Sequence, residues 1–175
     1  MVEGESEEVY FNRIARMSDS FSIVVKISKD KRCKDIILNC AKEAARLGLE
    51  NDDMKVAVFD LDVVDGNELD EAIALAEKEG VLIMASNLSF EVWLLMHLEE
   101  VSHVYTQKDY EDRLSVLLGS KYRKSKGLKE KVNPGSVQDA IRRGRIRLDS
   151  YDALNCKTTP NSSVLWYLLS LIFDS

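Results

Sequence analysis

Two aspartates separated by one residue follow a short apolar run near the middle of the chain. Residues 56–59 are Val, Ala, Val and Phe, and Asp60 and Asp62 come directly after them. A near-continuous apolar run predicts a buried strand of a parallel sheet. Because side chains alternate across a strand, both carboxylates point to one side if the chain stays extended. Such carboxylates suit Mg²⁺ or Mn²⁺; the alternative is that they only shape a polar turn.

The first residues of the chain supply a second group of carboxylates. We expect Glu3 at the end of a very short strand, and Gly4 permits a sharp reversal after it. A helix is expected next, with Ser6 as its cap and acidic residues in its first turn. Glu7, in that turn, can point back toward the crevice that Glu3 borders. A second acidic cluster strengthens the interpretation of the aspartate pair as a metal site.

The elements around these carboxylates alternate between strands and helices. The β-branched run 21–28 and the apolar run 81–85 predict strands. Apolar residues at three- and four-residue spacing predict helices over 33–47 and 68–79, each followed by glycine. This alternation predicts an α/β fold with a parallel sheet flanked by helices. Open sheets of this kind bind ligands at the carboxyl ends of their strands, where both aspartates fall.

Another polar turn follows the strand at 81–85. Ser86 and Asn87 stand at the same expected edge of the sheet, and an apolar helix begins at once. Glu91 falls in the first turn of that helix, and His97 lies six residues later, about 240° further round the helix. The two side chains therefore need not share a face, and a structural role for His97 is favoured over a ligand or proton shuttle.

Charge is segregated along the chain. Residues 1–120 hold 13 Lys and Arg against 25 Asp and Glu, whereas residues 121–147 hold 10 against 2. An acidic body with one basic segment predicts a polyanion-binding patch next to a metal-binding pocket. The alternatives are a basic helix and loop that are merely solvated, or a surface for a protein partner. The candidate nucleic-acid-binding residues are Lys121, Arg123, Lys124, Lys126, Arg142 and Arg143.

Length and composition bound the fold class. The chain has 175 residues, of which 45% are hydrophobic and 31% charged, as is typical of a globular protein. We expect one compact domain, with an α/β core over 1–105 and a helical, basic extension over 106–175 packed on it. No apolar run reaches the roughly 18 residues of a membrane span, and no charged-then-apolar leader opens the chain. These features predict a cytoplasmic protein, with its three cysteines reduced.

Several of these motifs together resemble a known family. Glu3-Gly4 at a strand end, followed by Asp60-Leu61-Asp62, resembles the TOPRIM domain of topoisomerases, primases and OLD-family nucleases. Four longer sequence segments are similar to the RloB-like family of TOPRIM proteins from restriction-linked and phage-defence loci. These segments are residues 3–11, 58–62, 86–97 and 159–164. The chain departs from that family at Leu88 and Ser89, where Pro and Cys are usual.

The resemblance implies a TOPRIM-like, Rossmann-like sheet and a metal-dependent nuclease. Glu3 would act as a general base or metal ligand, Asp60 and Asp62 would bind Mg²⁺ or Mn²⁺, and Glu7 would support a second ion. The substrate would be RNA such as tRNA, or DNA, cleaved in phage defence beside a partner ATPase of ABC or AAA type. A homo-oligomer is compatible with this role. The alternatives are a non-catalytic or partner-activated nucleic-acid-binding module, and a phosphoryl- or nucleotidyl-transfer enzyme without a glycine-rich phosphate loop.

Overall fold

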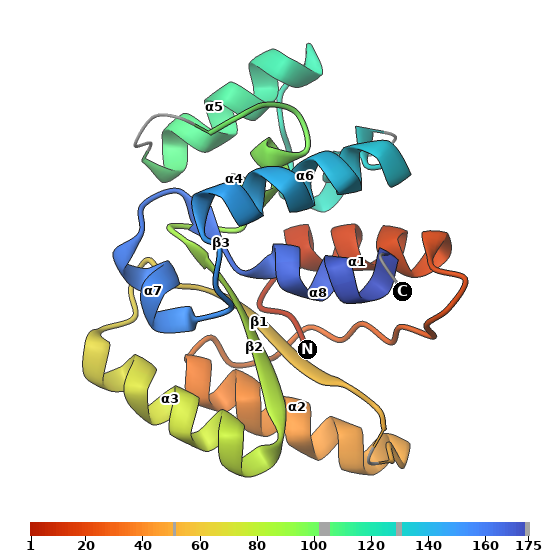
Figure 1. Ribbon diagram of the computed structural model, residues 1–175, viewed down its shortest axis with the longest axis vertical. Coiled ribbons are helices and arrows are strands. Elements are labelled where there is room, and N and C mark those ends of the chain that lie inside the picture. The colour runs from red at the N-terminus through yellow and green to blue at the C-terminus, as the bar shows by residue number, and fades with distance from the viewer. Residues whose placement is uncertain (51, 102–105, 129–130, 174–175) are drawn as a thin grey trace.

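A small mixed sheet, with strands in the order β1-β2-β3, lies at the centre of the protein (Figure 1). The structure is a computed structural model that describes residues 1–50, 52–101, 106–128 and 131–173. β1 (Lys55–Asp60) and β2 (Val81–Asn87) are parallel, as predicted, with Asp60 opposite Ser86. β3 (Ser162–Ser163) pairs antiparallel with β2, so the prediction of a wholly parallel sheet is wrong. Two serines after a turn carry no apolar run, which is why the sequence did not predict this strand.

The N-terminal residues extend the sheet on the other side of β1. Val2 forms parallel bridges with both Val58 and Ile27. Its N–H donates to the Lys26 carbonyl at 2.8 Å, and the Val58 N–H donates to the Met1 carbonyl at 2.9 Å. Of the predicted strand over 21–28, only Ile27 forms a bridge, to Val2.

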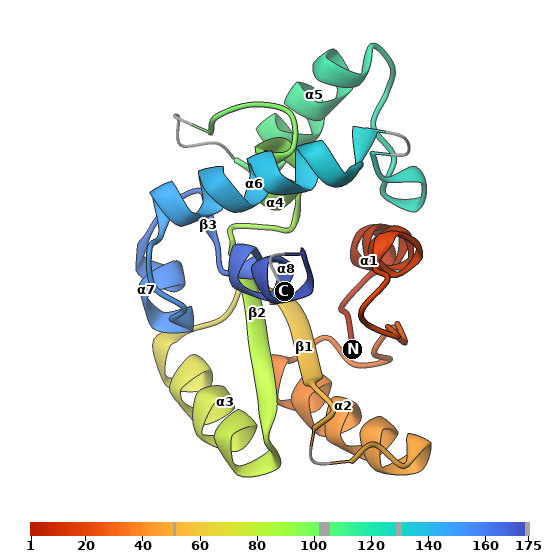
Figure 2. The same cartoon turned by 45° about the vertical axis from the view of Figure 1, so that its right-hand side comes forward.

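Helices cover both faces of the sheet (Figure 2). α2 (Cys33–Leu47) and α3 (Gly66–Glu79) pack on one side, and α1 (Glu5–Met17) and α8 (Leu165–Phe173) lie on the other. Both predicted glycine stops are confirmed, since Gly48 and Gly80 end α2 and α3 in left-handed conformations with φ of 69° and 63°. The predicted Ser6 cap is wrong: Gly4 is the N-cap residue of α1, and Ser6 lies buried inside the helix.

Of the remaining helices, α4, α5 and α6 gather beyond the carboxyl ends of β1 and β2, at the top of Figure 1, whereas α7 lies lower, beside the sheet. Thr106 and Asp109 form a capping box at the start of α5, and Asn133 is the N-cap residue of α6. α7 was not predicted from the sequence. The predicted boundary between core and extension, at residue 105, lies outside the described residues. These elements are α4 (Glu91–Met96), α5 (Gln107–Leu118), η1 (Lys124–Lys126), α6 (Pro134–Arg147) and α7 (Ala153–Thr158).

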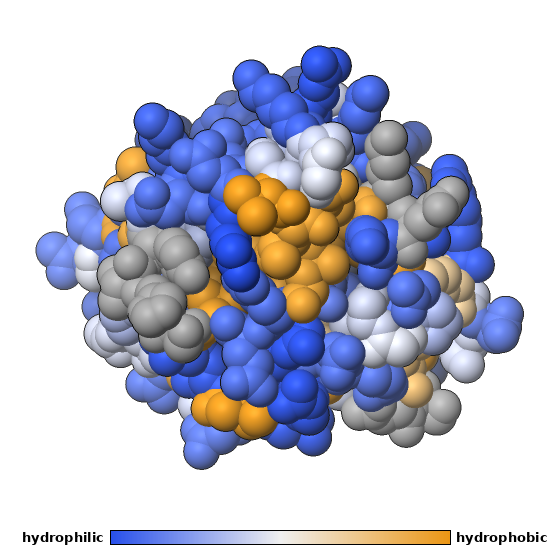
Figure 3. Space-filling model, turned by 90° about the horizontal axis from the view of Figure 1, so that it is seen from above, coloured by the Kyte–Doolittle hydropathy of each residue, from blue (hydrophilic) through white to orange (hydrophobic). Residues whose placement is uncertain are grey.

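The surface seen from this end is mainly hydrophilic, with an apolar area near its centre (Figure 3). Among the exposed apolar residues of the α5 and α6 helices are Val116, 68% exposed, and Ile146, 74% exposed. Within the described residues, no helix is long and apolar enough to cross a membrane.

Candidate functional site

The predicted carboxylates meet where β1 ends. Glu3 leaves the N-terminal bridge beside β1, and its Oε2 accepts a hydrogen bond from the Asp60 N–H at 3.1 Å. The Asp60 side chain is half-buried, whereas Asp62 lies beyond the strand and is exposed. Asp62 Oδ1 accepts a hydrogen bond from the Val63 N–H at 2.8 Å. Asp60, the last residue of β1, therefore lies within the site, whereas Asp62 lies at the margin of the site.

Glu7 is the most deeply buried of the four carboxylates predicted to bind metal, with 5% of its surface exposed. A Cβ at Gly4 would lie 3.3 Å from Glu7 Oε2, so the absent side chain at Gly4 leaves room for this carboxylate. Burial, aided by the negative charges of Glu3 and Glu91, raises the pKa of Glu7 to about 7. Glu7 therefore titrates near neutral pH.

Asp60 shares the same electrostatic environment. Burial raises the pKa of Asp60 well above its usual range, and the neighbouring charges of Glu7, Glu3, Glu91 and Asp62 raise it further. The structure thus brings the four predicted carboxylates into one interacting group and adds Glu91 to it. Anions held this close are stable together only if a proton or a cation offsets their repulsion.

Glu91 is anchored by groups that the sequence did not single out. It begins α4, is 1% exposed, and accepts a hydrogen bond from the Tyr122 hydroxyl at 3.2 Å. Ser6 Oγ lies 3.4 Å from Glu91 Oε1 and 3.1 Å from the Tyr122 hydroxyl. Ser6 is more than 80 positions away in the sequence from both Glu91 and Tyr122. A local sequence pattern therefore could not predict these contacts.

Lys124 forms an ion pair with this group of carboxylates. Its Nζ lies 3.6 Å from Glu91 Oε1. Partial burial lowers the pKa of Lys124, but the charges of Glu91, Glu111, Asp60 and Glu7 outweigh that effect and raise it. The sequence predicted a phosphate contact for Lys124; the structure places its ammonium group against the carboxylates instead of leaving it fully solvated.

The donor set fits a hard divalent cation in its chemistry. Among the described residues, no three His, Cys, Asp or Glu side chains are arranged to hold a metal ion together. Mg²⁺, however, commonly keeps several waters and takes only one or two protein carboxylates, the rest coming from substrate phosphates. The half-buried Asp60 and the buried Glu7, whose pKa values are raised first by burial and then by neighbouring carboxylates, meet that requirement.

Ser86 and Asn87 hold the end of β2 in place. Asn87 Nδ2 donates to the carbonyls of Cys156, Lys157 and Thr159 at 3.0, 2.8 and 3.2 Å. Ser86 Oγ lies 2.9 Å from Ser163 Oγ on β3. The two side chains fasten α7 and β3 to the sheet, so the structure gives both a packing role beside the site.

His97 lies in a separate polar contact inside the core. Its Nε2 is 3.1 Å from the Tyr10 hydroxyl, and its Nδ1 is 3.1 Å from Ser136 Oγ. Burial, aided by the charge of Arg143, lowers the pKa of His97 to about 3. The ring is therefore neutral at physiological pH and is held by hydrogen bonds on both nitrogens.

The other candidate nucleic-acid-binding residues occupy different environments. Arg143 is 15% exposed and donates to the Met96 carbonyl at 2.6 Å, so it holds the end of α4. Arg142 is 51% exposed and lies 3.7 Å from Glu100. Lys121, Arg123 and Lys126 are exposed around η1. The six candidate residues therefore differ in burial and in the groups that they contact.

Comparison with known proteins gives one match. The model of a family described as RloB-like protein matches residues 1–170. No curated protein and no solved structure matches the chain.

Proposed function

The chain belongs to the RloB-like protein family, and from that premise we propose that it is a Mg²⁺-dependent nuclease of TOPRIM type. The observation that carries the proposal is the electrostatic coupling of Glu7 and Asp60 with Glu3, Glu91 and Asp62 at the carboxyl end of β1. Strongly perturbed pKa values cluster at functional sites, where burial and like charges are brought together.

The residues of the proposed site would have different roles. Asp60 and Glu7 would hold Mg²⁺, whose other ligands would be waters and a substrate phosphate, with Glu3 as the general base beside them and Asp62 at the margin. The bound ion would lower the pKa of a water molecule and stabilise the leaving oxygen of a phosphodiester. Glu91, which accepts a hydrogen bond from Tyr122, would add to the negative electrostatic potential of the site.

The exposed basic residues would hold the substrate outside this site. Lys121, Arg123 and Lys126 surround η1, which packs against α1, the helix that carries Glu7. Contacts of lysine and arginine to phosphates give affinity without sequence preference and weaken as salt rises. The proposed substrates are accordingly RNA such as tRNA, or DNA.

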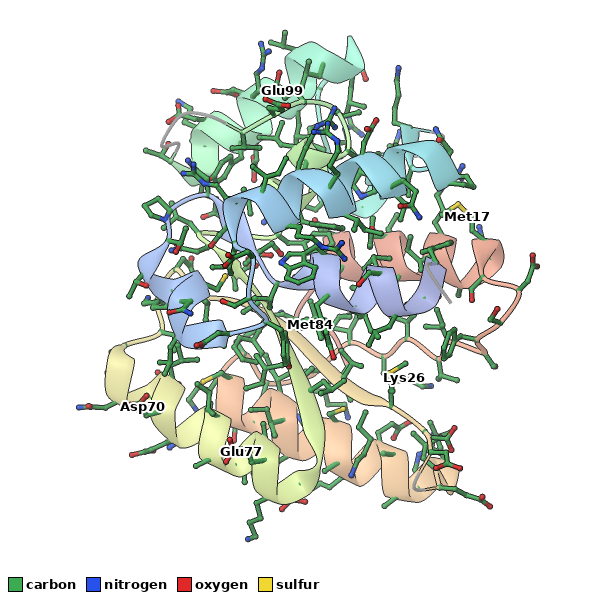
Figure 4. All side chains as sticks on the ribbon, in the orientation of Figure 1. Met17, Lys26, Asp70, Glu77, Met84 and Glu99 are labelled. Atoms are coloured by element: carbon green, nitrogen blue, oxygen red, sulfur yellow. The ribbon has the colours of Figure 1, made fainter. Side chains whose placement is uncertain are left out.

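Cleavage of labelled tRNA, single-stranded DNA and duplex DNA tests the proposal. We expect Mg²⁺- or Mn²⁺-dependent cleavage of at least one substrate, blocked by EDTA. The double variant Asp60→Ala, Asp62→Ala should lose at least about 100-fold in rate, as removal of metal ligands in such sites does. Asp70→Ala is the matched control, because Asp70 is exposed on the outer side of α3 (Figure 4). Unchanged cleavage by the double variant would refute the assignment of the site.

A second candidate function follows from Lys124. Its ammonium group lies against Glu91, where it offsets part of the negative charge that a metal ion would otherwise offset. We therefore retain, as the alternative, a nucleic-acid-binding module that becomes active only with a partner, proposed to be a defence ATPase. Metal-dependent cleavage by the purified chain would exclude this alternative. Metal binding without cleavage, restored on adding the partner, would support it.

A further inference from the structure

A short basic loop borders the carboxylates on the side away from η1. Residues 29–32 are Lys, Asp, Lys and Arg, and all four are exposed. The charge pattern along the sequence does not single out these residues, because they lie within the acidic first 120 residues of the chain. We call residues 29–32 the basic loop.

The register of the strands places the basic loop at the carboxyl edge of the sheet. Val2 forms parallel bridges with both Ile27 and Val58. The residues that follow on all three segments therefore run toward the edge where Asp60 ends β1. Two strand spacings, or about 10 Å, separate β1 from the segment that leads into the basic loop. The basic loop consequently leaves the sheet close to the carboxylates.

Hydrogen bonds hold the basic loop in one conformation. Ser28, which precedes the loop, is 4% exposed, and its N–H donates to the Val2 carbonyl at 2.8 Å. Ser28 Oγ accepts hydrogen bonds from the Asp30 N–H at 3.3 Å and from Asn39 Nδ2 at 3.1 Å. Asn39 Nδ2 also donates to Asp30 Oδ2 at 3.0 Å. The one carboxylate of the basic loop is therefore held by α2, the helix that carries Asn39.

Lys31 connects the basic loop to the candidate site. Its Nζ donates to the Glu3 carbonyl, and the Glu3 side chain in turn accepts a hydrogen bond from the Asp60 N–H. An ammonium group carries three donors. Lys31 can therefore hold the Glu3 carbonyl and a phosphate oxygen at the same time.

The two lysines provide the net positive charge of the basic loop. Arg32 Nε lies 2.7 Å from Asp35 Oδ2, so the charge of Arg32 is partly compensated on α2. Lys29 is exposed. Exposed ammonium groups on a loop of fixed shape suit the oxygens of a phosphate backbone.

The basic loop and η1 lie on opposite sides of the carboxylates. The basic loop leads into α2 and η1 packs against α1, and these two helices cover opposite faces of the sheet (Figure 2). Lys31 contacts Glu3, whereas Lys124 of η1 contacts Glu91. Glu3 and Glu91 both interact electrostatically with Asp60. A phosphate bound beside Asp60 would therefore lie between two basic segments of the chain.

We propose that the basic loop is a second binding site for the backbone of nucleic acid. Lys29 and Lys31 contact phosphates on one side of the cleaved bond, and the exposed lysines of η1 contact phosphates on the other side. This inference rests on the proposed function, because it takes the substrate of the carboxylate site to be a nucleic acid. Contacts of this kind position the backbone and add affinity without sequence preference.

Fluorescence anisotropy in EDTA tests the basic loop without metal binding or cleavage. The probes are labelled tRNA and a labelled single-stranded DNA oligonucleotide. The double variant Lys29→Ala, Lys31→Ala is compared with Lys42→Ala, Lys78→Ala, which removes the same charge from exposed positions on α2 and α3. The fold of each variant is checked by thermal unfolding.

The salt dependence of binding separates phosphate contacts from a general loss of charge. We expect the native protein to bind at least one probe. In the basic-loop variant, the slope of log affinity against log salt should fall in magnitude by about 1.5, because each lost phosphate contact removes about 0.7–0.9. The control variant should change the slope by less than about 0.5. Absence of binding by the native protein, or equal slopes in the two variants, would overturn the proposal.

Single variants separate a phosphate contact from a structural role of Lys31. Lys31→Arg keeps the positive charge and the donors, so it should keep the native salt slope. Lys29→Ala should lower the magnitude of the slope by about 1. An unchanged slope in Lys29→Ala, or a lowered slope in Lys31→Arg, would overturn the proposal.

A combined variant tests whether the basic loop and η1 hold the same strand. With the probe that the native protein binds, we expect one probe per chain. Adding Lys121→Ala and Lys126→Ala to the basic-loop variant should lower the slope by about 3 in total, because separate contacts to one strand add. Two probes per chain would refute this arrangement. Native protein that binds with the expected slopes but does not cleave would refute the nuclease activity while supporting the basic loop as a nucleic-acid site.

Discussion

Asn87 and Glu7 are both buried polar residues near the carboxyl ends of neighbouring strands, yet their surroundings differ in kind. Asn87 donates to three carbonyls and is satisfied within the protein. Glu7 is surrounded by other carboxylates, and its pKa is raised to about 7. A buried polar group with its partners stabilises a fold, whereas a buried cluster of like charges destabilises it until a ligand or proton arrives. This difference indicates that the polar residues at the end of β2 hold the fold together, whereas the carboxylates at the end of β1 form the candidate functional site.

The largest effect on stability is expected for Asn87→Ala. The substitution removes two N–H donors that are shared among three buried or half-buried carbonyls, and it leaves acceptor groups unpaired, at a cost of about 3 kcal/mol. Urea denaturation measures the change, and Asn67→Ala, at an exposed residue in the first turn of α3, is the control. If both variants were equally stable, Asn87 would not fasten α7 to the sheet.

Glu7→Gln should have the opposite effect on stability, because it should stabilise the folded protein. The folded protein keeps a proton on Glu7 up to a pKa of about 7, whereas the unfolded chain loses it near 4.5. The stability of the native protein therefore falls as pH rises between these values, and the full penalty applies above 7. In EDTA at pH 8 we expect Glu7→Gln to be more stable than the native protein by about 1–3 kcal/mol.

A measurement of the same stability difference at low pH is the control for this prediction. Near pH 4 the difference between Glu7→Gln and the native protein should shrink toward zero, because the carboxyl group is then neutral in both folded and unfolded states. Glu77→Gln, at an exposed residue of α3 (Figure 4), should show no such dependence. A destabilised Glu7→Gln protein at pH 8 would mean that the cluster is not in repulsion.

Lys124→Met should have the smallest effect on stability, within about 1 kcal/mol, because the Lys124 side chain is 46% exposed. Its effect on metal binding is more informative. Removing this positive charge should tighten Mg²⁺ binding by about 3- to 10-fold through weaker repulsion of the ion. Lys126→Met, on the same short helix η1, is the control for a general loss of positive charge. Weaker Mg²⁺ binding by Lys124→Met alone would show that Lys124 does not compete with the ion.

The central strands and their helices were predictable because their patterns are long and periodic. β1, β2, α2 and α3 follow apolar runs and glycine stops that local physics explains. β3 and α7 were missed, since a two-residue strand and a six-residue helix carry too little periodicity. Met84, labelled at the centre of Figure 4, belongs to the predicted buried strand and is 0% exposed.

The site itself was only partly predictable. Glu3, Glu7, Asp60 and Asp62 could be named because strand ends and a glycine turn place them by local geometry. Their interaction with Glu91 depends on how α4 packs against α1, and the roles of Ser6 and Tyr122 depend on contacts across the whole chain. Lys124 was grouped with its basic neighbours because charge along a sequence does not tell which side chain turns inward.

Mg²⁺ titration calorimetry tests the central claim most directly, that the carboxylates at the end of β1 form a divalent-cation site. The native protein, Asp60→Asn with Asp62→Asn, and the control Asp70→Asn should be compared at pH 7.5, after treatment with EDTA and its removal. We predict a saturable binding heat for the native protein and the control, and its loss in the double variant. Equal binding by all three proteins, or no binding by the native protein, would contradict the account.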